Sequence, residues 1–206
     1  MDKLWETRER TFLMDFKKWF MIGFLVLILI GCQNDSRSNA TVGLYNKDGD
    51  MIGTAKLTET SNGVEVLVNA EGLEPGPHGF HVHEFPVCEG PDFTSAGNHF
   101  NPTGKVHGLM NTEGSHVGDM PNLEADASGK IVEAKAMLPE ATLLDGKNSL
   151  MKGEGTSLVI HEAIDDGFSQ PAGEAGGRVA CGKIQLNDDG EMPTDPMEQK
   201  GKKEEE

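Results

Sequence analysis

All seven histidines of the chain lie between residues 78 and 161, and imidazole is a common ligand of transition metals. Two of them, His81 and His83, lie two residues apart in the apolar run GFHVHEF. Side chains alternate between the faces of a β-strand, so both imidazoles would point to one face and Val82 to the other. Such a pair can bind one metal ion, or it can be two polar residues at the rim of a sheet. The spacing alone leaves both interpretations open.

The other histidines strengthen the metal interpretation. The long segment 86–121 is rich in Gly, Asn and Pro, and it carries Asp119 together with His99, His107 and His116. A stretch of that length without secondary structure is normally either disordered or functional, and a bound metal would order it. Three imidazoles and one carboxylate suit tetrahedral zinc. His161, on a later predicted strand, would join His81 and His83 in a set of nitrogen donors suited to copper.

The elements that must position these donors read as β-strands. Strand-like segments are TVGLYN, MIGTAKLTET, GVEVLVNAEG, GPHGFHVHEF, a hairpin over NLEADASGKIVEAKAML, TSLVIHEAI and GRVACGKIQL. Turn sequences such as KDGD and SNG separate the first three, and no segment has a convincing helical pattern. The pattern predicts an all-β fold: an eight-stranded antiparallel Greek-key sandwich or barrel with two long functional loops.

The charge balance excludes one class of partner. Asp and Glu number 34 against 18 Lys and Arg, a formal net charge of −16. Binding to phosphate backbones needs clusters of basic residues that this chain lacks, so we expect no nucleic-acid partner.

The N-terminal segment FKKWFMIGFLVLILIGC has the order of a signal peptide: basic residues, then an apolar run shorter than the ~20 residues of a membrane span. The sequence LIGC at its end resembles a bacterial lipoprotein cleavage box, with Cys32 as the lipidated first residue. An uncleaved N-terminal anchor is the alternative. Both interpretations place the folded domain outside the cytoplasm, as a membrane-anchored protein of a bacterial cell envelope.

The expected pairing of the remaining cysteines follows from that location. With Cys32 carrying lipid, Cys88 and Cys181 remain as one pair, which would form a disulfide in an oxidising compartment; two buried free thiols are the alternative. We expect four segments along the chain: a signal peptide (1–31), a lipidated tether (32–39), a folded domain (40–187) and a disordered, charged tail (188–206).

The stretch from Gly76 to Leu123, with LVIHEAIDD and GGRVACG further on, resembles the copper/zinc superoxide dismutases. The resemblance in pattern runs from about Ala40 to Leu186. It implies the family's β-barrel fold, copper and zinc as cofactors, and superoxide as the substrate. The copper ligands implied are His81, His83, His99 and His161. The zinc ligands implied are His99, His107, His116 and Asp119, so that His99 bridges the two metals.

The resemblance also implies roles for residues around the metals. Arg178 matches the arginine beside the copper, which together with His99 makes the catalytic pair. Asp165 matches a carboxylate that hydrogen-bonds one ligand of each metal, and Cys88 with Cys181 matches the family disulfide. His78 matches a histidine that binds no metal. Copper would alternate between two oxidation states, while zinc would hold the loop and tune the bridging imidazole.

Two departures from the family pattern limit what the resemblance implies. Only four residues, EFPV, separate His83 from Cys88, so the dimer of the animal enzymes is not carried over and the oligomeric state stays open. The loop EAIDDGFSQPAGEAGG has no lysine, although family members often place lysines there to attract the anion. Two other classes remain as alternatives: a non-catalytic copper- and zinc-binding lipoprotein, and a structural sandwich with degenerate sites.

Overall fold

The computed structural model describes residues 38–187, 190 and 192–193. The predicted signal peptide, the lipidated Cys32 and the predicted tail therefore fall almost wholly outside the described residues, and the four-segment division of the chain stays a prediction. No helix among the described residues is long and apolar enough to cross a membrane.

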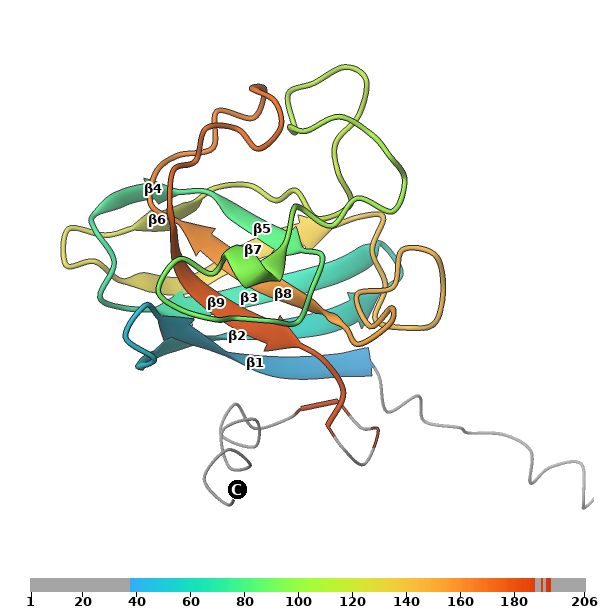
Figure 1. The fold of residues 1–206 in the computed structure, drawn as a ribbon, viewed down its shortest axis with the longest axis horizontal. Helices are drawn as coiled ribbons and strands as arrows, with labels where there is room; N and C mark the ends of the chain where they lie inside the picture. Colours follow the sequence, from blue (N-terminus) through green and yellow to red (C-terminus); the bar gives the residue numbers. More distant parts are fainter. Residues whose placement is uncertain (1–37, 188–189, 191, 194–206) are drawn as a thin grey trace, which may run out of the picture. The chain divides into compact units, whose positions relative to one another are not determined.

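The described part of the chain is built from antiparallel strands, as the sequence predicts (Figure 1). Their bounds are β1 (Asn39–Asn46), β2 (Met51–Thr60), β3 (Gly63–Ala70), β4 (Gly76–His78), β5 (Phe80–His83), β6 (Leu123–Ala125), β7 (Ile131–Leu138), β8 (Thr156–His161) and β9 (Arg178–Ile184). One short 3-10 helix, η2 (Thr94–Ala96), lies in the first long loop. Strict alternation of buried and partly exposed residues along β3 shows why these segments form a sheet with one face on a core.

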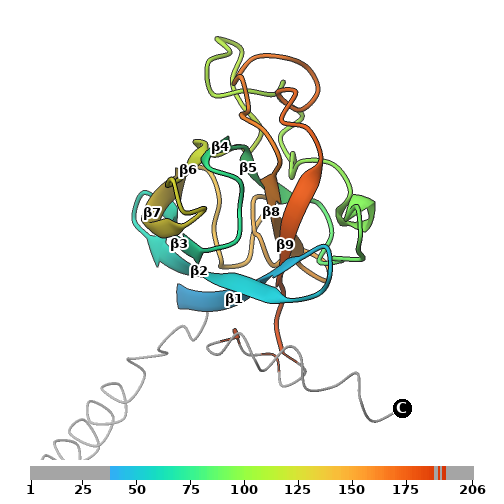
Figure 2. The same ribbon diagram turned by 90° about the vertical axis from the view of Figure 1, so that its left-hand side faces the viewer.

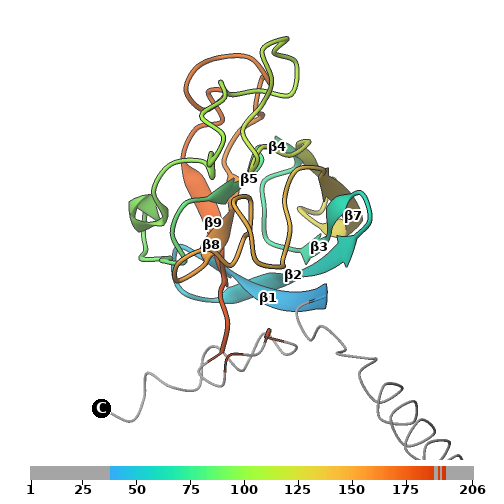
Figure 3. The ribbon, with the colours of Figure 1, turned by 90° about the vertical axis from the view of Figure 1, so that its right-hand side faces the viewer.

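The strands form a closed barrel, which Figures 2 and 3 show end-on. Seven of them make one sheet in the order β5-β8-β9-β1-β2-β3-β7, and β4 pairs with β6 in a second. The edge strands of the large sheet, β5 and β7, directly follow β4 and β6 in the chain. The pairing of β4 with β6 therefore joins the two edges, and inward side chains such as Val42, Leu57 and Phe80 fill the interior.

One predicted strand is divided in the structure. The segment GPHGFHVHEF was predicted as a single strand, but the chain changes partner at Gly79, so β4 pairs with β6 and β5 pairs with β8. The Gly79 N–H donates to the Ala163 carbonyl, and a Cβ at Gly79 would lie 2.7 Å from the Ala175 Cβ. Glycine is therefore required where the strand turns this corner, and nine strands are described in place of the eight predicted.

Two long loops meet on one side of the barrel, above the strands in Figure 1. The first loop, residues 84–122, joins β5 to β6, and the second loop, residues 162–177, joins β8 to β9. Their backbones touch: the Met110 N–H donates to the Gly167 carbonyl at 3.1 Å, and a Cβ at Gly108 would lie 2.1 Å from that same oxygen. The two predicted functional loops are thus parts of one assembly.

Candidate metal centre

The structure brings both predicted ligand sets together. His81 and His83 come from β5 and His161 ends the adjacent β8, so three donors stand on paired strands. The other predicted ligands come from the first loop. Donor atoms of His81, His83, His99 and His161 lie within 4.8 Å of one another, and so do those of His99, His107, His116 and Asp119. His99 belongs to both sets.

The first set presents lone pairs to a common centre. The His83 Nδ1 lies 3.0 Å from the Gly97 carbonyl, so it carries the proton and leaves a lone pair on Nε2. The His161 Nδ1 faces the Gly176 carbonyl in the same way, and its Nε2 lies 3.3 Å from the His83 Nε2. Two lone pairs at that distance repel each other unless a cation lies between them.

The other two members complete this arrangement. The His81 Nε2 donates to the Asp165 carboxylate at 2.7 Å, and its Nδ1 is buried without a hydrogen-bond partner. The His99 Nε2 is likewise buried and unpartnered. Burial of unpaired polar atoms is costly, and a metal ion that accepts these lone pairs removes the cost. Four imidazole nitrogens are a donor set that suits copper.

Burial also keeps three of these rings neutral, those of His83, His99 and His161. It lowers the pKa of His83 to about 2 and that of His161 to about 3, with repulsion from neighbouring histidines adding to the effect. The pKa of His99 falls to about 4 because burial outweighs the hydrogen bond with Asp119. Neutral imidazole is the form that ligates metals.

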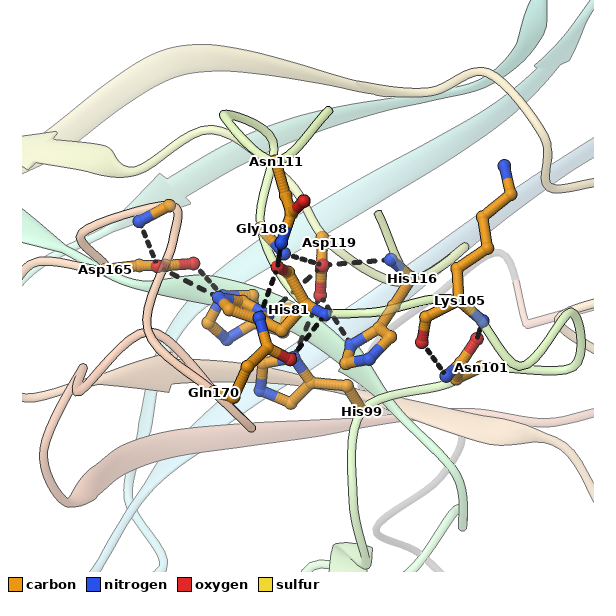
Figure 4. Close-up of polar contacts among 12 residues, drawn as sticks. His81, His99, Asn101, Lys105, Gly108, Asn111, His116, Asp119, Asp165 and Gln170 are labelled. Atoms are coloured by element: carbon orange, nitrogen blue, oxygen red, sulfur yellow. Dashed lines mark hydrogen bonds and ion pairs between the residues drawn. The ribbon is translucent and has the colours of Figure 1, made fainter. Parts of the chain in front are cut away.

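Asp119 is the centre of the second set (Figure 4). Its Oδ1 lies 2.9 Å from the His99 Nδ1 and 3.2 Å from the His116 Nδ1, and its Oδ2 lies 3.1 Å from the His107 Nδ1. The His107 Nδ1 makes no hydrogen bond despite this proximity. Donors around tetrahedral zinc are separated by about 3.3 Å for bonds of ~2.0 Å, so these separations suit a zinc ion.

The electrostatics of Asp119 agree with a cation site. Burial alone would raise the pKa of its carboxyl, but the histidines around it hold that pKa well below the usual range. Its Oδ2 also accepts the backbone N–H groups of Gly108 and His116, at 2.9 and 3.0 Å. The carboxylate is therefore ionised and accepts backbone hydrogen bonds without a metal.

Asp165 links the two sets. Its Oδ2 accepts from the His81 Nε2 at 2.7 Å, and its Oδ1 lies 3.1 Å from the His107 Nε2. One carboxylate thereby fixes the orientation and tautomer of one ring in each set. The Asn122 carboxamide holds Asp165 in turn, donating to its carbonyl at 2.8 Å and accepting its N–H at 2.9 Å.

Arg178 begins β9 beside the first set. Its guanidinium donates to the carbonyls of Phe93 and Gly97, at 2.5 and 2.6 Å. The Gly97 carbonyl is the same one that accepts from His83, so one peptide group orients both side chains. Gly97 adopts a φ of 78°, and a Cβ there would lie 2.6 Å from the Phe85 ring, so only glycine fits.

A disulfide anchors this part of the first loop to the barrel. Cys88 and Cys181 are joined, with their Cα atoms 5.7 Å apart, and Cys181 follows Arg178 by three residues on β9. The predicted pairing is confirmed, and free thiols at these positions are excluded. Phe93, Ala96 and Val159 pack around the bridge in a small second core.

His78 belongs to neither set, as the resemblance implies. Its Nδ1 lies 2.7 Å from the His161 carbonyl and its Nε2 lies 2.7 Å from the Glu74 carbonyl. It therefore holds the backbone of His161 without offering a nitrogen to a metal.

Sequence reasoning missed three residues that position the site: Gly97, Asn122 and Gln170. Their only sequence signal is position: each lies two to five residues from a predicted ligand or from Asp165. Each of them makes a contact with a residue at least 43 positions away, as Asn122 does with Asp165, and no local pattern encodes such a contact.

This antiparallel barrel brings together a four-nitrogen set and a set of three histidines and one aspartate, with donors from β5, β8 and the first loop and one histidine in common. Such an arrangement defines a two-metal, copper/zinc class of protein. Comparison with known proteins identifies the family. The family model for copper/zinc superoxide dismutase matches residues 51–184. The chain belongs to the copper/zinc superoxide dismutase family, and it is an enzyme of that class with copper and zinc as cofactors.

The relatives cover most of the chain. Superoxide dismutase [Cu-Zn] 2 of Aquifex aeolicus is 48% identical over 166 residues, 80% of this chain and 95% of that protein. The crystal structure of a SOD-like protein from Bacillus subtilis superposes with a TM-score of 0.67 at 38% identity, over 69% of this chain and 96% of that one. The Cu/Zn superoxide dismutase from Brucella abortus has a TM-score of 0.61 at 33% identity, over 71% and 99%. The predicted family and fold class are confirmed.

Proposed function

We propose that this protein is a superoxide dismutase, converting two superoxide anions and two protons into dioxygen and hydrogen peroxide. The observation that carries the proposal is the convergence of four imidazole nitrogen donors beside the guanidinium of Arg178. His81, His83, His99 and His161 would hold copper, and His99, His107, His116 and Asp119 would hold zinc. When bound, copper supplies a reversible one-electron oxidation and reduction, and zinc a fixed positive charge.

Arg178 would bind the anion. Two of its N–H groups are held by the Phe93 and Gly97 carbonyls, and a guanidinium has five N–H donors in all. The remaining donors are available for a charge-assisted hydrogen bond to superoxide. Because the side chain is fixed by two backbone carbonyls, little entropy is lost when the anion binds.

His99 would handle the proton. Its Nδ1 faces Asp119 in the zinc set while its Nε2 faces the copper set, so only Nε2 can hold a proton beside the reacting oxygen. Asp165 keeps the neighbouring ring of His81 in the tautomer whose Nδ1 carries a lone pair, and that nitrogen would be held by copper.

The location is part of the proposal. We infer that the protein acts at the extracytoplasmic face of a bacterial membrane, attached through lipidated Cys32. The disulfide between Cys88 and Cys181 supports an oxidising compartment, where such bonds persist. The proposed attachment rests on the sequence LIGC alone. Fractionation of cells that produce the Cys32→Ser variant tests it: the active protein should be released from the membranes.

Metal analysis with a superoxide assay separates this function from a non-catalytic copper- and zinc-binding lipoprotein. The purified protein, loaded with both metals, should consume superoxide catalytically, whereas His161→Ala should retain zinc and lose both copper and activity. His161 serves as the test because it belongs to the copper set alone. A wild-type protein that holds both metals and leaves superoxide untouched would refute the enzymatic proposal and favour metal binding alone.

A further inference from the structure

The side chain of Gln170, in the second loop and labelled in Figure 4, holds the backbone of the zinc-set histidine His107. The Gln170 Oε1 accepts the His107 N–H at 2.9 Å, and the Gln170 Nε2 donates to the His107 carbonyl, also at 2.9 Å. The carboxamide thus satisfies both polar groups of one residue, as an adjacent strand would. His107 itself is fully buried, so its backbone needs partners inside the protein.

The same short segment of the second loop also holds the His107 ring. Asp165, five residues before Gln170, lies with its Oδ1 3.1 Å from the His107 Nε2. The ring is thereby contacted at one nitrogen and the backbone at two points, while the remaining nitrogen, Nδ1, faces Asp119. The segment 165–170 therefore leaves His107 a single free donor atom and determines the direction in which that atom points.

The residues around this segment are closely packed, so its backbone has little room to move. Gly173 adopts a φ of 72°, and a Cβ there would lie 2.7 Å from the His107 Nε2 and closer still to Asp165. The Gln170 Nε2 is itself positioned by the Phe168 carbonyl at 3.0 Å. The second loop thus closes on His107 from the side opposite Asp119.

We propose that Gln170 is a positioning residue for the zinc set: it fixes the backbone of His107 so that the imidazole Nδ1 points at the metal position. This inference rests on the proposed zinc ligands and extends them to a residue that binds no metal. Two hydrogen bonds of ordinary strength are involved. Part of the Gln170 side chain faces water, which would replace some of the hydrogen bonding lost to His107. A loss on the order of three- to tenfold in zinc retention is expected when the carboxamide is removed.

Two variants of similar length separate the two hydrogen bonds. Gln170→Glu keeps an acceptor for the His107 N–H but sets a carboxylate oxygen against the His107 carbonyl. Gln170→Met removes both bonds and keeps the side-chain length. Phe168→Ala is the matched control, because Phe168 lies on the same loop, is 62% exposed and makes no side-chain contact with His107 among the hydrogen bonds described.

The experiment uses the whole chain purified in detergent and has two readouts that need no turnover. The first is the rate at which zinc passes from the loaded protein to a chelator; the second is the visible spectrum of cobalt(II) bound in place of zinc, which reports ligand geometry. Both Gln170 variants should release zinc three- to tenfold faster and shift the cobalt bands, while Phe168→Ala behaves as wild type.

Wild-type rates and spectra in both Gln170 variants would overturn the inference, and so would an equal acceleration in Phe168→Ala, which would mean that any change to the loop suffices. A wild-type protein without a tetrahedral cobalt spectrum would instead refute the zinc set itself. The two failures are therefore distinguishable.

Discussion

Replacing both Cys88 and Cys181 with alanine tests how much of the barrel's stability depends on the first loop being tied to β9. The bridge joins residues separated by 93 positions. In the chain-entropy model a closed loop of that size stabilises the folded state by about 4–5 kcal/mol, because it restricts the unfolded chain. For a domain of this size each kcal/mol corresponds to about 2–4 °C in Tm, so the metal-free variant should unfold roughly 8–20 °C lower than the oxidised wild type.

Thermal unfolding followed by circular dichroism measures this shift, with all metals removed because bound metals add their own stabilisation. The reduced wild-type protein is the matched control, since it keeps both sulfur atoms in the buried site and lacks only the bond. It should unfold close to the variant. A variant within about 3 °C of the oxidised wild type would refute the reasoning, and so would mass spectrometry showing free thiols at both positions in protein from the cell envelope.

The same variant carries a second, local expectation. The bridge fixes the segment that presents the Phe93 and Gly97 carbonyls to Arg178, and Gly97 also orients His83. Activity should therefore be reduced even at temperatures well below the Tm of the variant. Zinc content should be retained, because the zinc set lies further along the loop. Full activity in a folded, bridge-free protein would show that the two carbonyls are held by packing alone.

Three further predictions concern the metals and the substrate. His99→Ala removes one ligand from each set, so activity should vanish and zinc affinity should fall, whereas His107→Ala should mainly weaken zinc; near-normal turnover of His99→Ala would contradict the two-metal site. Arg178→Glu should lower kcat/KM tenfold or more with unchanged metal content, because it replaces the cation that would dock superoxide. With a net charge of −16 opposing the anion and Lys105 paired with Glu140 at 2.5 Å, the wild-type rate should change only gently with added salt, and a steep fall would reveal an attractive field that these residues do not provide.

The sequence predicted those features that depend on local period. Alternation placed His81 and His83 on one face, and the structure keeps them so on β5. The division of that strand from β4 at Gly79 was not predictable, because a glycine inside an apolar run does not say which strand will pair on each side of it. The deciding contact, with Ala175 in the second loop, lies almost a hundred residues away.

The ligand sets were predictable from residue types and from the resemblance, but the groups that position them were not. Gly97 acts through its own carbonyl, and the side chains of Asn122 and Gln170 bind backbone groups of distant segments. Every residue offers such backbone groups. A sequence pattern identifies side chains with unusual chemistry. It cannot identify the ordinary amide or carbonyl that happens to hold one of them.

The two sets differ in what orders them, and the histidine that they share connects the two. Three donors of the copper set stand on the paired strands β5 and β8, where sheet hydrogen bonds fix their spacing before any metal binds. The zinc set comes wholly from the first loop, whose residues have few ladder hydrogen bonds to hold them, so the metal itself must supply part of their ordering. His99 and Asp165 each contact both sets, one as a common ligand and one as a common hydrogen-bond acceptor. Ordering of the loop by zinc would therefore also order His99, the one member of the proposed copper set that the barrel strands do not provide.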